Sequence, residues 1–213
     1  MDIVLFGKPG VGKGTQAPRL SAALGVPCIA TGDVLRAARK AGTPLGREAQ
    51  AYMDRGDLVP DAVILGIMKE ALSADGARRG SLLDGVVRTE PQAEGLARVL
   101  TELGRQVDAV LFFDAPDAEL VRRLSGRTVC ETCQTPSMGL EPGSACTKPG
   151  CGGKLVRRAD DEPAAVQHRL NVYQAQTAPV LEWYRRHGVR VEMIDAVGDV
   201  DMVTSRVVAA LGL

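Results

Sequence analysis

Short apolar runs alternate along the chain with longer segments whose apolar residues recur at helical spacing. The apolar runs lie at 3–6, 28–30, 82–83, 109–113 and 191–194, and turn or polar residues follow most of them. The segments with helical spacing include 16–24, 62–72, 92–103 and 164–186. Alternation of short buried strands with helices predicts an α/β domain built on a doubly wound parallel sheet.

Two stretches break this alternation. The segment 128–154 is rich in Gly, Pro, Cys, Thr and Ser and poor in periodic apolar residues. We therefore expect a small insertion that something other than an apolar core holds together. The segment 31–59 has helical character and predicts a helical flap beside the sheet. Its helix breakers are Gly42, Pro44, Gly46 and Gly56.

Composition narrows the class of protein. The length of 213 residues suits one domain, and with 45% hydrophobic but 3% aromatic residues the core must consist mainly of Val, Leu, Ala and Ile. Lys plus Arg equals Asp plus Glu at 26 each, which does not favour nucleic acid or membrane as the main partner. The first residues lead directly into a strand, and no run approaches the roughly 18–20 apolar residues of a membrane helix. We expect a cytoplasmic protein, in which closely spaced cysteines are more often metal ligands than disulfides.

The segment 7–15 reads Gly-Lys-Pro-Gly-Val-Gly-Lys-Gly-Thr and lies between the first predicted strand and a helix, which is the context of a phosphate-binding loop. Its glycines allow backbone N–H groups to point at phosphate oxygens, and the helix N-terminus adds positive potential. Lys13 supplies a charge for the β and γ phosphates, and Thr15 a hydroxyl near the metal. Gly14 separates them, where the general pattern has Ser or Thr directly after Lys. The loop indicates nucleotide binding without specifying a reaction; a glycine-rich turn with no ligand is the alternative.

Six ordered motifs over nearly the whole chain resemble adenylate kinases and their nucleoside monophosphate kinase relatives. They occupy 12–16, 31–36, 56–61, 83–89 with 92–93, 123–127, and 158–161 with 169–170. The resemblance implies a P-loop three-layer α/β/α fold with a parallel five-stranded sheet, a helical NMP-binding flap and a small metal-stapled lid. It implies a single kinase domain over 1–213, with the core at 1–30, 60–121 and 160–213, the flap at 31–59 and the lid at 122–159.

The activity implied by the resemblance is reversible, Mg²⁺-dependent phosphoryl transfer from ATP to AMP, giving two ADP. Such a reaction requires positioning and charge neutralisation, for which guanidinium groups are well suited. By similarity to the family, the ATP-binding residues are Gly10, Gly12, Lys13, Gly14, Thr15, Arg123 and Arg127. The AMP-binding residues are Thr31, Arg36, Val59, Gly85, Arg88, Gln92, Arg158 and Arg169. The catalytic residues are Lys13, Arg88, Arg123, Arg158 and Arg169.

Two further assignments concern magnesium and the acceptor base. Asp84 ends a predicted strand and is the best carboxylate for the hydration shell of Mg²⁺. Thr31 and Gln92 match positions that face the AMP base in adenylate kinases, and an amide can pair with both a donor and an acceptor edge. UMP/CMP kinases tend to carry Asn near this point, so Gln92 favours AMP.

The chain departs from the family at Val86 and Val87, which replace the Phe and Pro of the usual Asp-Gly-Phe-Pro-Arg run. The family has a cis peptide before this Pro. Before a non-proline residue a cis bond costs roughly 2.5–4 kcal/mol, so we expect a trans bond and a different backbone path to Arg88.

Four cysteines lie in the irregular insertion and predict a metal site. Cys130 and Cys133 have two residues between them, and Cys146 and Cys151 have four, two more than in the commonest knuckle. A tetrahedral Cys₄ site for structural Zn²⁺ is the favoured interpretation, and metal binding would supply the folding energy of the lid. Iron as a substitute, disulfides and free thiols are the alternatives.

Several single residues carry weaker expectations. Asp33 and Arg36, three apart, should share one helix face. Asp160 and Asp161 fit either a solvated helix start or a support for the arginines. Cys28 should be a small buried residue of its strand. His168 and His187 should be solvated helix residues, and Trp183 and Tyr184 should pack in the core.

Other functions remain open at this point. Within the family, GTP could replace ATP as donor, or UMP or CMP could replace AMP as acceptor. The chain could instead be a nucleotide-binding regulator that lost catalysis through Val86 and Val87. A zinc ribbon that binds nucleic acid or protein ranks last, because the cysteine segment has few basic residues and no aromatic residue for stacking. A monomer is expected from the resemblance.

Overall fold

The computed structural model describes residues 1–213, apart from the side chain of Leu45. Its centre is a sheet of five parallel strands in the order β2-β3-β1-β4-β8, which confirms the predicted fold class. The strands are β1 (Asp2–Phe6), β2 (Cys28–Ala30), β3 (Ser81–Asp84), β4 (Ala109–Asp114) and β8 (Arg190–Asp195). All five predicted strands are present, each within a residue or two of its expected bounds.

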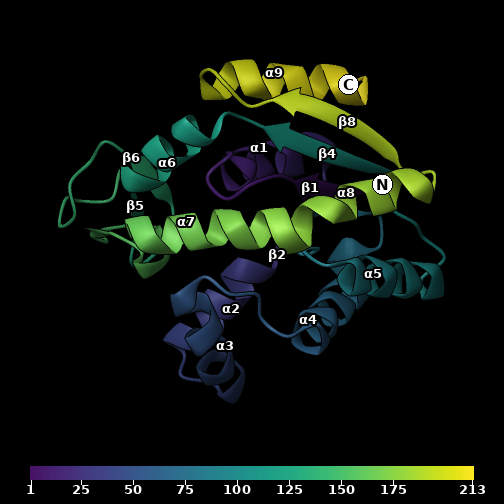
Figure 1. Ribbon diagram of the computed structural model, residues 1–213, viewed down its shortest axis with the longest axis horizontal. Helices are drawn as coiled ribbons and strands as arrows, with labels where there is room; N and C mark the ends of the chain where they lie inside the picture. Colours follow the sequence, from purple (N-terminus) through teal and green to yellow (C-terminus); the bar gives the residue numbers. More distant parts are fainter.

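Helices cover both faces of this sheet, giving three layers (Figure 1). Alternate strand residues face opposite layers, so that Val4 and Phe6 pack in one apolar cluster and Ile3 and Leu5 in the other. The core helices are α1 (Lys13–Leu24), α4 (Asp61–Ser73), α5 (Glu90–Glu102), α6 (Asp117–Ser125), α7 (Pro163–Val172), α8 (Ala178–Arg186) and α9 (Val200–Leu211). Short helical turns are η1 (Asp75–Ala77), η2 (Ala159–Asp161) and the π-helical η3 (Tyr173–Thr177).

The predicted helix 164–186 is therefore α7, η3 and α8 in succession. Its aromatic residues Trp183 and Tyr184 are buried in the core, as expected. His187 is exposed, as expected, although its ring stacks on that of Trp183 with the centroids 3.9 Å apart.

The flap consists of α2 (Thr31–Lys40) and α3 (Pro44–Arg55), which lie away from the sheet in Figure 1. The helix breakers explain its bounds: Pro44 is the first residue of α3, and Gly56 ends it with φ 78°. The side chain of Thr43 caps α3 by accepting a hydrogen bond from the N–H of Gly46 at 3.1 Å.

The insertion is more regular than its sequence predicted. It contains a second, antiparallel sheet in the order β6-β5-β7, made of β5 (Arg127–Cys130), β6 (Pro136–Met138) and β7 (Leu155–Val156). Its buried apolar residues are few, chiefly Val129, Cys130 and Leu155. The expectation of a segment with almost no apolar core is therefore confirmed, while the expectation of irregular structure is wrong in part.

The prediction that Cys28 is buried is wrong. Its strand, β2, is at the edge of the sheet, and Cys28 is exposed at the first position of that strand. An edge strand is covered on one side only by a neighbour, so its first residue can face solvent.

Within the residues that the structure describes, no helix combines the length and apolar character needed to cross a bilayer.

Candidate functional site

The loop between β1 and α1 is folded tightly against the end of the sheet. Gly7 has φ 141°, and a Cβ atom there would lie 2.4 Å from the carbonyl oxygen of Phe113 in β4. Only glycine fits such a close approach. Gly10 and Gly12 also have positive φ, and Gly12 caps the helix that Lys13 begins. Gly14 and Thr15 are exposed in the first turn of α1.

Lys13 folds back over this loop. Its Nζ donates hydrogen bonds to the carbonyl oxygens of Gly7 at 2.6 Å and Lys8 at 3.1 Å. Desolvation lowers the pKa of Lys13 to about 8, Asp84 opposes that shift, and the neighbouring Arg88 adds to it. Burial raises the pKa of Asp84, and Lys13 counteracts it. The end of β3 and the phosphate loop therefore place a cation and a carboxylate in one electrostatic environment.

Arginines from distant segments converge beside this pair. Desolvation by the surrounding protein lowers the pKa of Arg88 to about 10, although the residue as a whole is exposed, and the positive charge of Arg169 lowers it further. Burial likewise lowers the pKa of Arg158 to about 10, with Arg36 as the next cause. Positive groups that depress one another's pKa form a site suited to anions.

Two of these guanidinium groups have unused donors. The buried Nε atoms of Arg36 and Arg158 have no hydrogen-bond partner among the described atoms. Arg36 does pair with Asp33 through another nitrogen, which confirms their shared helix face. Arg157 is exposed, whereas Arg158 is half-buried, so Arg158 is the member of that pair directed toward the site. A buried unpaired donor is costly, which makes a phosphate oxygen a natural partner.

Asp160 and Asp161 hold the arginines in place. Asp161 is 2% exposed and accepts hydrogen bonds from Arg127 Nε at 2.8 Å and Nη2 at 2.5 Å. Arg169 Nη1 lies 3.0 Å from an Asp160 carboxylate oxygen and 3.4 Å from one of Asp161. Of the two interpretations left open by the sequence, support for the arginines is therefore confirmed.

Arg123 contacts the phosphate loop from α6. Its guanidinium donates to the carbonyl oxygens of Val11 at 3.3 Å and Ala196 at 3.0 Å, and to the carboxylate of Glu119 at 2.7 Å. Arg123 thus connects the phosphate loop with the turn after β8.

A cavity lies between the flap and the core. Its lining includes the AMP-site candidates Thr31, Arg36, Val59, Gly85, Arg88, Gln92 and Arg169. Arg158 is not among these lining residues. The cavity joins segments from α2, from the 56–59 turn, from the loop after β3 and from α7.

The loop that carries Arg88 follows a trans path. Among the described residues no peptide bond is cis, which confirms the expectation for Val86 and Val87. Both valines are buried in the apolar core. Arg88 Nε donates to the carbonyl oxygen of Gly85 at 3.1 Å, and the hydroxyl of Thr31 donates to the same oxygen at 3.0 Å. The two valines thus anchor the loop, and Arg88 remains within the cleft.

Gln92 is 1% exposed, and protein groups hold both ends of its amide. Its Oε1 accepts from the backbone N–H of Arg88 at 2.8 Å, and its Nε2 donates to Asp61 at 2.7 Å. The amide is therefore fixed before any ligand binds.

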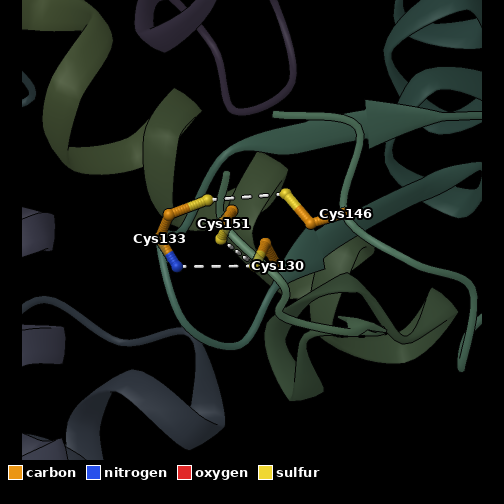
Figure 2. Close-up of side chains that lie close together, drawn as sticks. All are labelled: Cys130, Cys133, Cys146 and Cys151. Atoms are coloured by element: carbon orange, nitrogen blue, oxygen red, sulfur yellow. Dashed lines mark hydrogen bonds between the residues drawn. The ribbon is translucent and has the colours of Figure 1, made fainter. Parts of the chain in front are cut away.

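The four cysteines of the insertion form a compact cluster, shown in Figure 2. Their sulfur atoms all lie within 4.8 Å of one another. The Sγ atoms of Cys130 and Cys151 are 3.6 Å apart, as are those of Cys133 and Cys146. Tetrahedral coordination with metal–sulfur bonds of about 2.3 Å places sulfurs roughly 3.8 Å apart. The four residues therefore fit a single metal ion, and all four thiols are free of disulfide bonds.

Backbone groups around the cluster favour thiolates. The N–H groups of Thr132 and Cys133 each lie 3.4 Å from the sulfur of Cys130, and the second of these contacts is the main cause that lowers the pKa of Cys130. Gly153 approaches the cluster closely, since a Cβ atom there would lie 2.6 Å from Cys130 Sγ. Gln134, directly after Cys133, has φ 60°, a conformation that non-glycine residues rarely adopt.

The sequence did not assign a role to Glu119 or Asp61. Glu119 could have been found from the sequence, because it lies at helical spacing from Arg122 and Arg123, at i+3 and i+4. Asp61 lay inside a recognised motif, but its partners Thr89 and Gln92 come from a different helix. No local signal could reveal such a contact. His168, expected to be solvated, is exposed but also lies 2.7 Å from a carboxylate oxygen of Asp57.

Comparison with known proteins gives a consistent result. A family model described as adenylate kinase matches residues 5–189. The adenylate kinase of Gemmatimonas aurantiaca is 61% identical over 211 residues, covering 99% of each chain. The adenylate kinases of Thermodesulfovibrio yellowstonii and Staphylococcus epidermidis are 44% and 46% identical over 215 residues, again over 99% of each chain.

Proposed function

Because this chain belongs to the adenylate kinase family, we propose that it catalyses the reversible transfer of the terminal phosphoryl group of ATP to AMP, giving two ADP. The observation that carries the proposal is the concentration of cations in one cleft. Lys13, Arg88 and Arg158 all have lowered pKa values there, caused mainly by desolvation. The phosphates of two bound nucleotides would supply negative charge for these cations to neutralise.

The donor ATP occupies the phosphate loop. Lys13 exchanges its carbonyl contacts with Gly7 and Lys8 for phosphate oxygens, and the N–H groups of 10–15 surround the phosphates. Arg123 and Arg127 approach the phosphates from α6 and β5. The Arg123 guanidinium, which contacts the carbonyl oxygen of Ala196, also lies next to the adenine base of ATP. This assignment is supported by the position of Arg123 between the loop and the turn after β8.

The acceptor AMP occupies the cavity between flap and core. Arg36 and Arg88 hold its phosphate, while Thr31 and Gln92 face its base beside Val59 and Gly85. Arg158 and Arg169 lie between the two nucleotides and bind the group in transfer. In-line transfer requires both phosphates to be aligned, and guanidinium groups from both sides of the cleft provide that alignment.

Magnesium bound to ATP supplies charge neutralisation across the phosphates. Asp84 is the residue that would hold its hydration shell, because its carboxylate is buried next to Lys13 and next to the phosphate loop. A bound dication would lower the raised pKa of this carboxyl and so favour its charged form.

The lid metal is proposed to be structural Zn²⁺, held by Cys130, Cys133, Cys146 and Cys151. Four thiolates fill a tetrahedral shell and leave no position open for catalysis. The ion would stabilise the fold of the lid, whose sheet buries little apolar surface. Lid and flap then close over the nucleotides and exclude water, which would otherwise accept the phosphoryl group. The domain bounds at 31–59 and 122–159, the monomeric state and the cytoplasmic location stay predictions.

A coupled assay tests the proposal. Purified protein with Mg²⁺ and ATP is given AMP, UMP or CMP as acceptor, and GTP replaces ATP as donor with AMP. Formation of ADP from ATP and AMP alone supports the assignment. Turnover of UMP or CMP, or a preference for GTP, would change the base assignment but keep the arginine roles. A folded protein that binds a bisubstrate dinucleotide but turns over no acceptor would support the alternative of a nucleotide-binding regulator without catalytic activity.

A further inference from the structure

Asp61 is the first residue of α4 and contacts two residues at the start of α5. Its Oδ1 accepts a hydrogen bond from Gln92 Nε2 at 2.7 Å and another from the hydroxyl of Thr89 at 3.1 Å. Thr89 in turn caps α5 by accepting from the N–H of Gln92 at 3.2 Å. One carboxylate therefore joins the beginnings of two helices, and one of its two partners, Gln92, lines the acceptor cavity.

The two partners of the Gln92 amide have opposite hydrogen-bonding character. A carboxylate oxygen only accepts hydrogen bonds, whereas the backbone N–H of Arg88 only donates. With the amide as it stands, both contacts are favourable. A flipped amide would face donor with donor at Arg88 and acceptor with acceptor at Asp61. Because the site is buried, such mismatches are costly, so the amide has a single orientation.

Each end of the amide keeps one further hydrogen-bonding position, since a primary amide accepts two bonds and donates two. The free positions are one acceptor on Oε1 and one donor on Nε2. Adenine offers the matching edge, with a donor at its 6-amino group and an acceptor at N1. A 6-oxopurine offers the reverse, an acceptor at O6 and a donor at N1, and would need the flipped amide.

We propose that Asp61 is a specificity-determining positioning residue, which fixes the orientation of the Gln92 amide so that the site accepts 6-aminopurine and rejects 6-oxopurine monophosphates. The inference rests on the proposed function, in which Gln92 faces the acceptor base. Arg88 N–H, as a main-chain group, sets one end of the amide in any variant. Asp61 sets the other end and is open to substitution.

The test compares AMP with IMP, which differ at the two atoms concerned, as acceptors for the intact enzyme with saturating ATP. The variants are Asp61→Asn, which offers an amide donor to a flipped Gln92, and Asp61→Ala, which offers nothing. Glu90→Gln is the matched control, because it removes a first-turn carboxylate from α5 that pairs with the exposed Arg186. Thermal unfolding and the KM for ATP report whether each variant folds.

We expect the ratio of kcat/KM for AMP over IMP to fall about tenfold or more in both Asp61 variants, through the KM for the acceptor, while the KM for ATP and the control stay unchanged. In a Gln92→Leu background, Asp61→Asn should change the ratio no further, because Asp61 acts through Gln92. An unchanged ratio in both folded Asp61 variants overturns the inference; Asp61 would then only connect the first turns of α4 and α5. Lack of AMP turnover by the unmodified enzyme would instead remove the proposed function, before any variant is compared.

Discussion

Arg127 and Asp161 form an ion pair that joins the segments leading into and out of the proposed lid. Arg127 begins β5, Asp161 ends the turn η2, and two hydrogen bonds of 2.8 and 2.5 Å connect the guanidinium with the carboxylate. Asp161 is buried and also lies 3.4 Å from Arg169. The chain thus enters and leaves the lid at a single ion-paired point, beside a residue of the proposed transfer site.

Replacement of Asp161 by Ala should destabilise the protein by about 3 kcal/mol, because it leaves buried guanidinium charge without its partner. Asp161→Asn should cost less, since an amide oxygen still accepts one hydrogen bond. Urea unfolding measures the difference. Glu162→Gln, a change at the exposed neighbouring position, should stay within about 0.5 kcal/mol of the unmodified protein. Equal effects at 161 and 162 would show that the ion pair does not stabilise the fold.

Replacement of Arg88 by Lys should raise the KM for AMP by about 30- to 100-fold, equivalent to roughly 2–3 kcal/mol, because a single ammonium cannot reproduce the guanidinium contacts. The KM for ATP should change little. Steady-state kinetics with each nucleotide varied in turn measures both values. The matched control is Arg157→Lys, at an exposed arginine. A rise of the two KM values together would contradict the acceptor role of Arg88.

The depressed pKa of Lys13 predicts a pH dependence of stability. The folded protein releases this proton near pH 8, whereas an unfolded lysine keeps it until about pH 10.5. Between these values the unfolded state binds more protons, so the stability contributed by this residue increases as pH rises. Relative to Lys13→Met, the unmodified protein should therefore gain on the order of 2 kcal/mol from pH 7.5 to pH 10. Denaturant unfolding of both proteins across this range measures the gain; a constant difference would show that Lys13 is not desolvated.

Metal removal should unfold the lid. We expect elemental analysis to find one Zn²⁺ per chain. A Cys133→Ser variant should lose the ion, and its Tm should fall by about 10 °C, which corresponds to a loss of roughly 4 kcal/mol in the free energy of unfolding. Cys28→Ser is the control, because Cys28 lies in β2 and outside the cluster. Full metal content in Cys133→Ser, or none in the unmodified protein, would argue against the site.

Gln134, which directly follows the metal-ligand candidate Cys133, has a strained backbone conformation. Its φ of 60° costs a side chain roughly 1–2 kcal/mol, while its Nε2 regains part of this through long contacts of 3.2 and 3.3 Å with the carbonyl oxygens of Cys130 and Glu131. Gln134→Gly should therefore raise the stability of the metal-bound protein by about 0.5–1 kcal/mol, and Gln134→Val should lower it. Thermal unfolding with metal present distinguishes them. A less stable glycine variant would mean that the side-chain contacts outweigh the strain.

The sequence predicted those parts of the fold that local pattern determines. Each buried strand appears as an apolar run, and the phosphate loop as a glycine pattern between strand and helix, so both were found correctly. The lid sheet was missed because β6 and β7 have three and two residues, too few to show an alternating pattern. Cys28 was misplaced because sequence does not tell an edge strand from a central one.

The site residues likewise fall into those that local sequence patterns predict and those that tertiary contacts determine. The arginines were predicted from short motifs that resemble those of the family, and the cysteines from their close pairing within one short segment. The carboxylates that contact Arg127 and Gln92 depend on tertiary contacts, as Asp161 reaches Arg127 across 34 residues and Asp61 reaches Gln92 across 31. Such pairs depend on how helices meet, which neither periodicity nor motif spacing encodes.

The pairing of β5 with β7 brings the two ends of the lid next to each other, with Val129 opposite Val156. The chain therefore leaves the core for the lid and returns to the core at one place. Because the lid has its own small sheet and few buried apolar residues, we expect it to unfold separately from the five-stranded sheet. Hydrogen exchange in the lid should then report a local opening with a free energy far below that of global unfolding.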